Sequence, residues 1–328
     1  MLIDNHGREI NYMRLAVTDR CNLRCFYCMP ENGIKYMLRK DLLSFEEMYR
    51  LIKVYSELGI SKIRITGGEP FVRKGTMEFL EEVSKIEKIE QIHITTNGTF
   101  THDKIAQLER IGIKSINLSV DSLDAGRFFD ITRRDVFKDV MQTFNALVAS
   151  SIKVKINMVV MEGRNIEDIY PMIDLSQKLP VSVRFIEEMP FNGTEGQGNK
   201  SHWPMAKILN HISAKYNFHK IEDVPFSTSA NYKVENYVGS FGIIAAFSRT
   251  FCGTCNRIRV TPQGELKTCL YDGGVFSLRD FMRSGATDEE LKSSLISTLK
   301  LRAKDGFEAE KRRLEANTVS ESMATIGG

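Results

Sequence analysis

Between residues 12 and 188 the sequence alternates short β-branched runs with longer amphipathic segments. Such alternation is typical of repeated βα units, whose strands lie parallel in one sheet. The pattern predicts strands at 12–17, 62–66, 91–95, 115–120, 154–160 and 181–186. The spacing is compatible with a closed barrel and with an open doubly wound sheet, and it does not choose between them.

Helix start and stop signals occupy the segments between these strands. Ser44 with Glu47 has the capping-box pattern that begins a helix, and Gly59 is suited to end it. Pro171 interrupts the last segment, because a proline inside a helix removes a hydrogen bond. Helices are therefore predicted at 44–58, 76–86, 101–111, 136–150 and 166–179.

The alternation of predicted strands and helices ends after Met189. Residues 191–200 are rich in Gly and Asn and follow no period, so we place a boundary near residue 190. The chain would then consist of a core over 1–190 and a C-terminal region over 191–328.

The C-terminal region contains shorter elements. A helix is predicted at 205–215, and several short strands are predicted within 217–271, including a hairpin with its turn at 262–264. A capped helix begins at Thr287 and reaches about residue 302, and a charged tail follows. This part of the chain is therefore expected to be largely β in its first half.

Composition limits the classes of protein to consider. The 328 residues can bury a full core without crosslinks, and 45 Lys and Arg against 42 Asp and Glu leave a net charge of +3. So small a charge argues against a general nucleic-acid-binding protein. The sequence has neither an apolar stretch of about 18 residues nor a signal-peptide pattern, which favours a cytoplasmic, reducing location without a membrane partner. Cysteines in that compartment need an explanation other than disulfides.

The six cysteines fall into two groups of three, with more than 220 residues between them: Cys21, Cys25 and Cys28, then Cys252, Cys255 and Cys269. The first group follows the first predicted strand, at the sheet edge where α/β proteins bind ligands. A closed zinc site needs a fourth ligand, and the nearest histidine, His6, lies fifteen residues before Cys21. Three thiolates fit a 4Fe-4S cluster with one iron open to another ligand, and zinc remains the alternative.

The second group has the same character. Cys252 and Cys255 lie on a tight turn, and Cys269 follows fourteen residues after Cys255 from the next predicted strand. The absence of a nearby histidine in the sequence favours a second cluster with an open iron. The alternative is a zinc site completed by a distant histidine or aspartate.

Two further features concern a ligand. Arg257 and Arg259 are two residues apart on a predicted strand, so they share one face. Beside a metal site they favour an anionic substrate, although solvated strand edges also carry arginines. Gly67 and Gly68 follow the second predicted strand, where glycine lets the backbone approach a ligand or make a plain turn.

The segment from Cys21 to Cys28, with Tyr27 before the third cysteine, resembles the CxxxCxxC signature of radical S-adenosylmethionine (SAM) enzymes. The string Gly67-Gly68-Glu69-Pro70 is similar to the motif that contacts the SAM amino group in those enzymes. In that superfamily SAM binds the open iron and is cleaved to a 5′-deoxyadenosyl radical. The resemblance implies an α/β fold, an incomplete (β/α)6 TIM-type barrel, with a C-terminal β-containing extension that carries the second Fe-S cluster.

Over nearly its whole length the sequence resembles the GTP 3′,8-cyclases, radical SAM lyases that begin molybdenum cofactor (molybdopterin) biosynthesis. The matching stretches are MRLAVTDRCN, IRITGGEP, ITTNGT, NLSVDSLDA, VKIN, RFIEEMP, FCGTCNRIRVTPQGELKTCL and the terminal IGG. The resemblance implies conversion of GTP to (8S)-3′,8-cyclo-7,8-dihydroguanosine 5′-triphosphate. The radical would abstract the ribose 3′ hydrogen, and the resulting carbon radical would attack guanine C8.

The resemblance also assigns residues to sites. Cys21, Cys25 and Cys28 would hold the SAM-bound cluster, and Cys252, Cys255 and Cys269 the cluster whose open iron meets the guanine base. Residues expected to line the SAM site are Tyr27, Gly68, Ser119 and Met189. Residues expected to bind GTP are Arg14, Arg64, Thr95, Lys155, Arg257, Ile258 and Arg259. Gly327 and Gly328 match a flexible tail that enters the barrel, and no other catalytic residue is assigned.

The resemblance also implies partners for the enzyme. An external low-potential electron donor would reduce the clusters, and cyclic pyranopterin monophosphate synthase would act downstream. No nucleic acid polymer is expected, and the oligomeric state stays open between monomer and homodimer. A peptide-modifying radical SAM maturase is a rival, although such enzymes usually have a longer, more cysteine-rich C-terminal region. A zinc or electron-transfer module would bind no SAM.

Two stretches depart from the family pattern. After Thr132 a glycine is expected, and the chain has Arg133 and Arg134 instead. The loop at 192–200 also differs before Trp203. Both stretches lie outside the cluster and nucleotide motifs, so we expect them to affect local loop structure rather than activity.

Overall fold

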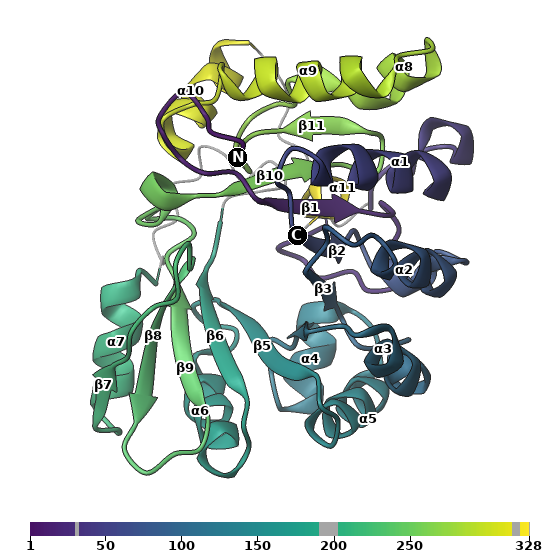
Figure 1. Ribbon diagram of the computed structural model, residues 1–328. Coiled ribbons are helices and arrows are strands. Elements are labelled where there is room, and N and C mark those ends of the chain that lie inside the picture. Colours follow the sequence, from purple (N-terminus) through teal and green to yellow (C-terminus); the bar gives the residue numbers. More distant parts are fainter. Residues whose placement is uncertain (30–32, 190–202, 317–321, 328) are drawn as a thin grey trace.

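Twelve strands form one continuous sheet in the computed structural model, which describes residues 1–29, 33–189, 203–316 and 322–327 (Figure 1). The loops at 191–200 and 192–200 considered above lie outside the described residues. The strands are β1 (Tyr12–Ala16), β2 (Lys62–Thr66), β3 (Gln91–Thr96), β4 (Ser115–Ser119), β5 (Lys153–Val160), β6 (Ser182–Glu187), β7 (Phe218–Lys220), β8 (Ser229–Val234), β9 (Ser240–Ile244), β10 (Arg257–Val260), β11 (Glu265–Lys267) and β12 (Phe276–Ser277).

The centre of the sheet is parallel. Strands β1 to β6 are neighbours in sequence order, β10 pairs in parallel with β1, and β9 pairs in parallel with β6. Antiparallel strands follow on each side, β11 and β12 beyond β10, and β8 and β7 beyond β9. The C-terminal part of the chain therefore extends the sheet of the N-terminal part at both edges.

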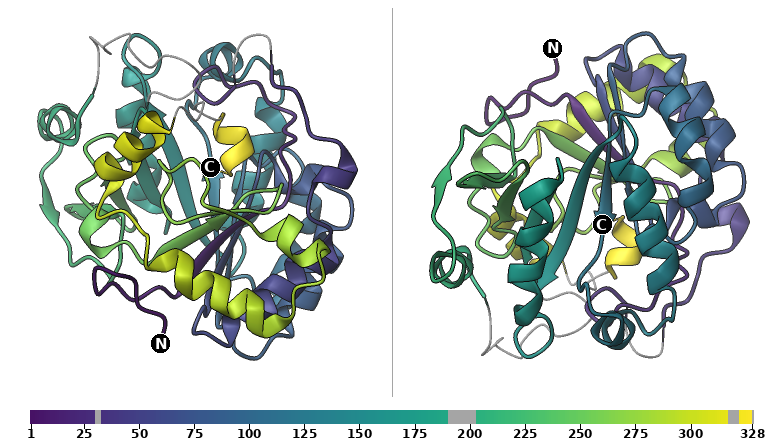
Figure 2. Two further views of the ribbon diagram at one scale, coloured as in Figure 1. Left: turned by 90° about the horizontal axis from the view of Figure 1, so that it is seen from above. Right: turned by 90° about the horizontal axis from the view of Figure 1, so that it is seen from below.

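Helices follow most of the parallel strands and lie outside the curved sheet, whereas α11 (Met323–Ile326) lies on its inner side (Figures 1 and 2). The first six are α1 (Phe45–Ser56), α2 (Thr76–Ser84), α3 (Ile105–Ile111), α4 (Ala125–Thr132), α5 (Phe137–Val148) and α6 (Ile169–Lys178). The rest are α7 (Met205–Ser213), α8 (Leu278–Arg283), α9 (Asp288–Leu299), α10 (Gly306–Glu315) and α11 (Met323–Ile326). No helix among the described residues is both long and apolar enough to cross a membrane.

Side chains along each central strand alternate between the two faces of the sheet. In β5, Val154, Ile156 and Met158 are buried against the helices, while Lys155 and Asn157 line a cavity on the inner face. The same period of two recurs in the residues of β1, β2, β4 and β6 that line this cavity, which are Tyr12, Arg14, Lys62, Arg64, Thr66, Asn117, Ser119, Arg184 and Ile186. The outer face thus forms the apolar core with the helices, and the inner face is polar.

Most predicted elements are confirmed. The six predicted strands agree with β1 to β6 to within one residue at each end. The capping boxes at Ser44 and Thr287 both form, and the predicted hairpin corresponds to β10 and β11, which pair antiparallel. Local signals were sufficient here because caps, turns and alternation all agreed.

Three expectations were wrong. Pro171 does not interrupt a helix, because α6 begins at Ile169 and the proline lies in its first turn, where backbone N–H groups have no partner within the helix. The segment after residue 302 is not only a charged tail, because it forms α10 and α11. No helix was predicted where α4 lies, although Asp124 caps it through the backbone N–H of Arg127.

Arg133 takes the place of the expected glycine and has a left-handed backbone, with φ of 56°, at the C-terminus of α4. This conformation costs a residue with a Cβ atom roughly 1–2 kcal/mol. The neighbouring carbonyls of Ile131 and Thr132 accept hydrogen bonds from the backbone N–H groups of Phe26 and Arg24 in the first cysteine segment. The position is therefore strained and adjacent to the site.

We predict that Arg133→Gly raises the free energy of unfolding by about 0.5–1 kcal/mol. The substitution removes the backbone strain, and the greater flexibility of glycine in the unfolded chain offsets part of that gain. Urea unfolding followed by circular dichroism measures the change. Arg134→Gly is the control, because Arg134 has no positive φ, and its replacement removes chain stiffness and an exposed hydrogen bond from its guanidinium to the Arg133 carbonyl. Equal loss of stability in both variants would contradict the account.

Candidate functional site

A cavity of 570 Å³ lies against the inner face of the parallel strands, and all six cysteines line it. All six are free thiols. The two groups, remote in sequence, therefore border a single space, and the cavity is the place to look for chemistry.

The two groups lie at opposite ends of the parallel strands. The first group follows the carboxyl end of β1, whereas Cys255 comes just before the amino end of β10. Because β10 pairs in parallel with β1, with Tyr12 opposite Arg257, the amino ends of the two strands are adjacent. Cys269 follows β11, which runs antiparallel to β10, and so returns to the same end. The inner face of the sheet separates the two thiol groups.

Backbone contacts with the Gly-Gly segment hold the start of the first cysteine loop. The N–H of Gly68 donates to the Thr18 carbonyl at 2.8 Å, and the N–H of Glu69 donates to the Arg20 carbonyl at 2.8 Å. A Cβ atom at Gly68 would collide with the Arg20 carbonyl, and one at Gly67 would lie 2.5 Å from the Thr18 carbonyl oxygen. In the described structure the glycines thus allow β2 to pack tightly against the loop that leads to Cys21.

Glu69 is fully buried behind this loop. Its carboxylate accepts hydrogen bonds from the backbone N–H of Asn97 at 2.7 Å and from the Thr96 hydroxyl. Burial raises the pKa of Glu69 to about 7 in spite of these bonds. The side chain ties the end of β3 to the Gly-Gly segment, a role that the sequence analysis did not assign.

The first three thiols are in an environment that disfavours their anionic form. Burial raises the pKa of Cys21 to about 11, with a further contribution from the Glu69 carboxylate. Burial raises the pKa of Cys28 to about 12 and also raises that of Cys25, next to Asp121. Deprotonated thiols here would need a positively charged group bound to them, as metal-ligand chemistry supplies.

The second group has a different electrostatic environment. Burial raises the pKa of Cys252, and raises that of Cys269 to about 12. Burial alone would raise the pKa of Cys255 too, but Arg257 and Arg302 beside it lower this pKa below its ordinary value. Arginines therefore act on Cys255, while Asp305 and Asp272 lie near Cys252 and Cys269. Glu69 and Asp121 act on the first group.

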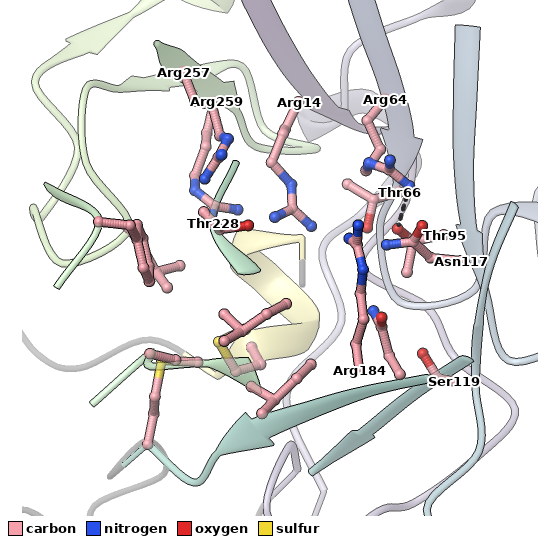
Figure 3. Close-up of a pocket in the computed structure, with 18 of the residues that line it drawn as sticks. Arg14, Arg64, Thr66, Thr95, Asn117, Ser119, Arg184, Thr228, Arg257 and Arg259 are labelled. Carbon is pink, nitrogen blue, oxygen red and sulfur yellow. Dashed lines mark hydrogen bonds between the residues drawn. The ribbon is translucent and has the colours of Figure 1, made fainter. Parts of the chain in front are cut away.

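Cations dominate the wall between the two groups. Nine lysine and arginine residues and five acidic residues are among the described lining residues, so the cavity is far more positive than the chain as a whole. Arg14, Arg64, Arg184, Arg257 and Arg259 converge on it from several strands (Figure 3). Such a wall suits an anionic ligand with several charges, because guanidinium groups can donate two hydrogen bonds to phosphate oxygens.

Most residues assigned from the resemblance line this cavity. Those in the wall are Tyr27, Gly68, Ser119, Met189, Arg14, Arg64, Thr95, Lys155, Arg257 and Arg259. Ile258 is the exception, because its side chain points to the opposite face of β10 and is completely buried in the core. Ile258 is not among the residues that line the cavity.

The C-terminal segment closes part of the cavity. The Arg259 guanidinium donates to the Gly327 carbonyl at 3.1 Å, and the Ser322 hydroxyl donates to the Cys28 carbonyl. Met323 and Ala324 of α11 line the wall. Gly327 therefore reaches the site, while Gly328 lies outside the described residues.

Sequence reasoning missed several residues of the wall. Lys62, Arg184, Asn117 and Asn157 all line the cavity. The Oδ1 atoms of both asparagines and the Nε of Arg184 are buried and have no hydrogen-bond partner in the part of the chain that the structure describes. Buried polar atoms of this kind are usually satisfied by a ligand or by water. The period-two pattern could have found Lys62, Asn117 and Asn157, because each lies two residues from an assigned residue. Arg184 lies on β6, where no residue was assigned, but it alternates with the apolar Val183 and Phe185.

Within the described ranges no three His, Cys, Asp or Glu side chains converge on one metal ion. A zinc ion needs its ligands to converge on a single point. The cysteines of a 4Fe-4S cluster bind different irons, so their sulfurs lie around the cluster and need no common point. The donor set of three thiols at each end of the cavity is the one that a 4Fe-4S cluster with one open iron would use.

Comparison with known proteins gives consistent matches. Residues 15–176 match the Radical SAM superfamily and residues 181–307 match Molybdenum Cofactor Synthesis C. The chain is 42% identical over 301 residues to "GTP 3′,8-cyclase" of Syntrophomonas wolfei, covering 91% of this chain and 92% of that protein. It is 40% identical over 332 residues to "GTP 3′,8-cyclase" of Geobacter sulfurreducens, covering 100% and 99%.

A solved structure has the same fold. The crystal structure of Streptococcus suis SuiB bound to S-adenosylmethionine superposes with a TM-score of 0.56 at 14% sequence identity. The match covers 88% of this chain and 65% of that chain. At this identity the similarity establishes the radical SAM fold, an α/β fold with a large parallel sheet.

We predict that Gly68→Ala lowers the free energy of unfolding by about 1–3 kcal/mol, because the added methyl group must displace the Arg20 backbone. Gly253→Ala is the matched control beside the other cysteine group, since a Cβ atom there meets nothing within 4 Å. Its effect should stay within about 0.5 kcal/mol. Urea unfolding of both variants measures the difference, and equal effects would contradict the packing role of Gly68.

Proposed function

Because the chain belongs to the GTP 3′,8-cyclase family of radical SAM enzymes, we propose that it converts GTP to (8S)-3′,8-cyclo-7,8-dihydroguanosine 5′-triphosphate. This reaction would place it at the first step of molybdenum cofactor biosynthesis. The observation that carries the proposal is the single cationic cavity with three thiols at each end. An enzyme that joins two parts of one nucleotide needs such a space, in which a radical source and the substrate meet.

The first cysteine group fits a 4Fe-4S cluster. Its three buried thiols are poor anions unless a cationic group binds them, and they border the cavity. In the proposed enzyme Cys21, Cys25 and Cys28 would hold three irons, and the fourth would be open to SAM. When bound and reduced, this cluster with SAM supplies a 5′-deoxyadenosyl radical.

The SAM site would be formed by the strand ends around this cluster. Tyr27 donates a hydrogen bond to Asp121 at 2.8 Å, which fixes the end of the cysteine loop against the end of β4. Ser119 is the last residue of β4, two residues before Asp121, and both line the cavity. Met189 accepts a hydrogen bond from the Tyr271 hydroxyl at 3.2 Å and completes the wall. With Gly68, these residues would orient SAM and exclude water.

We propose a second 4Fe-4S cluster on Cys252, Cys255 and Cys269, with an iron open to the guanine base. The support is the same count of three thiols at the far end of the cavity. Zinc would require a converging fourth ligand, and none converges within the described ranges. The base would then lie near the amino ends of β1 and β10, with the ribose toward SAM.

The basic wall would hold the triphosphate. Arg14, Arg64, Lys155, Arg257 and Arg259 face the cavity, and Thr95 lies beside Arg64, which donates to its hydroxyl at 3.4 Å. Each fixed cation about 4 Å from a phosphate charge contributes on the order of 4 kcal/mol at an effective dielectric constant near 20. We add Arg184 and Lys62, which line the cavity, to this set, and Ile258, which does not, is left out of it.

The finer architecture belongs to the same proposal. Residues 1–190 would form a partial (β/α)6 barrel, and residues 191–328 would close it with the second cluster, the GTP site and the glycine tail. The support is the order of β1 to β6 in the sheet and the extension of that sheet by β9 and β10. The described strands leave β12 and β7 as the two edges, so the sheet itself is not closed there.

The wider context follows from the reaction. The enzyme would take electrons from an external low-potential donor and pass its product to cyclic pyranopterin monophosphate synthase. A reducing cytoplasm would keep its six thiols free for iron. Assembly as a homodimer stays one option, and no described contact depends on it.

We predict that the anaerobically reconstituted protein, given SAM and a strong reductant, forms 5′-deoxyadenosine only when GTP is present. Mass spectrometry should identify a cyclised nucleotide with the mass of GTP, because the hydrogen atom that C3′ gives up to 5′-deoxyadenosine is replaced by one electron from the reductant and one proton. ATP in place of GTP is the control. Equal 5′-deoxyadenosine formation with a peptide and without GTP would overturn the assignment.

A pH dependence follows from Lys155. Burial, together with Arg184 and Arg64, lowers its pKa to about 7, so the free enzyme loses this cation as the pH rises through 7. Bound triphosphate favours the protonated form, so the dissociation constant for GTP should increase about tenfold between pH 6 and 8. Lys155→Arg keeps the charge and should remove most of that change. The titration of GTP affects both proteins equally, so it drops out when their pH profiles are compared. Identical profiles for Lys155→Arg and the original protein would contradict the role of Lys155.

A further inference from the structure

A buried ionic network lies behind the second cysteine group. The Asp4 carboxylate pairs with Arg8 at 2.7 Å and with Arg302 at 3.2 Å, and all three side chains are nearly or fully buried. Two arginines on one aspartate leave a net positive charge in this place. Removing two cations from water is costly, so their position needs an explanation beyond packing.

Both arginines contact the cysteine segment directly. Arg302 Nη2 donates to the Cys255 sulfur at 3.3 Å and to the Arg257 carbonyl at 3.0 Å. Arg8 Nη1 donates to the Cys252 carbonyl at 3.1 Å and to the Lys304 carbonyl at 2.7 Å. The network therefore joins the N-terminal segment and the segment after α9 to the second group, and it places one guanidinium on a sulfur.

The first group has no equivalent cation on its sulfurs among the contacts of the described residues. The Cys21 sulfur accepts from the backbone N–H of Leu23 at 3.4 Å and from the neutral Asn97 amide at 3.7 Å. The charged neighbours of the first group include the buried carboxylates of Glu69 and Asp121, and Arg24, which donates to the Cys21 carbonyl at 2.7 Å. The second group also has acidic neighbours, Asp305 and Asp272. Among the described contacts, what distinguishes the second group is a guanidinium that donates directly to a cysteine sulfur.

We propose that Arg302 is a positioning residue that tunes the second cluster, making it easier to reduce than it would be without the guanidinium. The inference rests on the proposed function, in that it requires a cluster on Cys252, Cys255 and Cys269. Hydrogen bonds to cluster sulfurs and nearby positive charge stabilise the more negative, reduced form. Asp4 and Arg8 hold Arg302 in place, and Arg302 acts through Cys255 rather than on the substrate.

The redox step concerned is a simple electron transfer. One electron from an added reductant, such as dithionite, enters the oxidised cluster, and the reductant is oxidised by the same amount. No bond to the protein forms or breaks.

The test uses the full chain with Cys21, Cys25 and Cys28 replaced by serine, so that only the second group can carry iron. After anaerobic reconstitution, an EPR-monitored titration gives the midpoint potential of that cluster. Arg302→Met should reduce the ratio of reduced to oxidised cluster about tenfold at a fixed applied potential. This change corresponds to a fall of about 59 mV in the midpoint potential of a one-electron couple. Arg302→Lys should recover part of the fall.

Arg283→Met is the matched control. Arg283 also makes several hydrogen bonds, to the carbonyls of Lys40 and Leu42 and to Glu47, but it touches no cysteine. Its loss should leave the potential unchanged. If Arg302→Met does not load iron, Arg302→Gln, which keeps a donor without the charge, carries the same measurement.

The outcomes separate the two proposals. Absence of iron in the parent triple variant would overturn the second cluster, and with it the proposed function of that group. If the cluster loads but its midpoint potential is the same in the parent, Arg302→Met and Arg302→Gln, the tuning role alone is overturned. A lower midpoint potential in Arg302→Met and partial recovery in Arg302→Lys would support the tuning role. A purely structural role would not make the potential depend on the charge of the side chain.

Discussion

The site depends on the parallel pairing of β10 with β1. This pairing aligns Arg257 with Tyr12 and Arg259 with Arg14, so two arginines from the C-terminal part of the chain join the inner face of the N-terminal strands. It also places Cys255 beside the amino end of β1, with the first cysteine loop at the carboxyl end of the same strand. The length of these strands thus sets the separation between the thiol groups.

The alternation of side chains along the strands determines what lies between them. Apolar residues on one face pack against the helices, so every second residue is free to be polar without weakening the core. The chain places several lysines and arginines at these positions. Burying so many positive charges is costly unless an anionic ligand binds them. Both thiol groups have acidic and basic neighbours, but Arg257 and Arg302 lower the pKa of Cys255, whereas Glu69 helps to raise that of Cys21. The two thiol sites of one fold therefore differ in the charged side chains that act on their sulfurs.

Much of this arrangement could be predicted from the sequence. The alternation located β1 to β6, the capping boxes located α1 and α9, and the cysteine spacing separated two sites of three thiols. What could not be predicted depends on contacts between remote segments. Arg302 lies far from Cys255 in the chain, and α11 is held by Arg259 and Cys28 rather than by its own propensity. Arg184 and Asn157 were within reach of the alternation pattern, and the motif-based assignment passed over them.

The central claim is that a nucleotide lies between two iron–sulfur clusters and meets the second one through its base. The most direct measurement is the EPR spectrum of the reduced second cluster, in the full chain with Cys21, Cys25 and Cys28 replaced by serine, recorded with and without GTP. The account predicts that GTP changes the spectrum and that ATP does not. A spectrum unchanged by saturating GTP would contradict the claim.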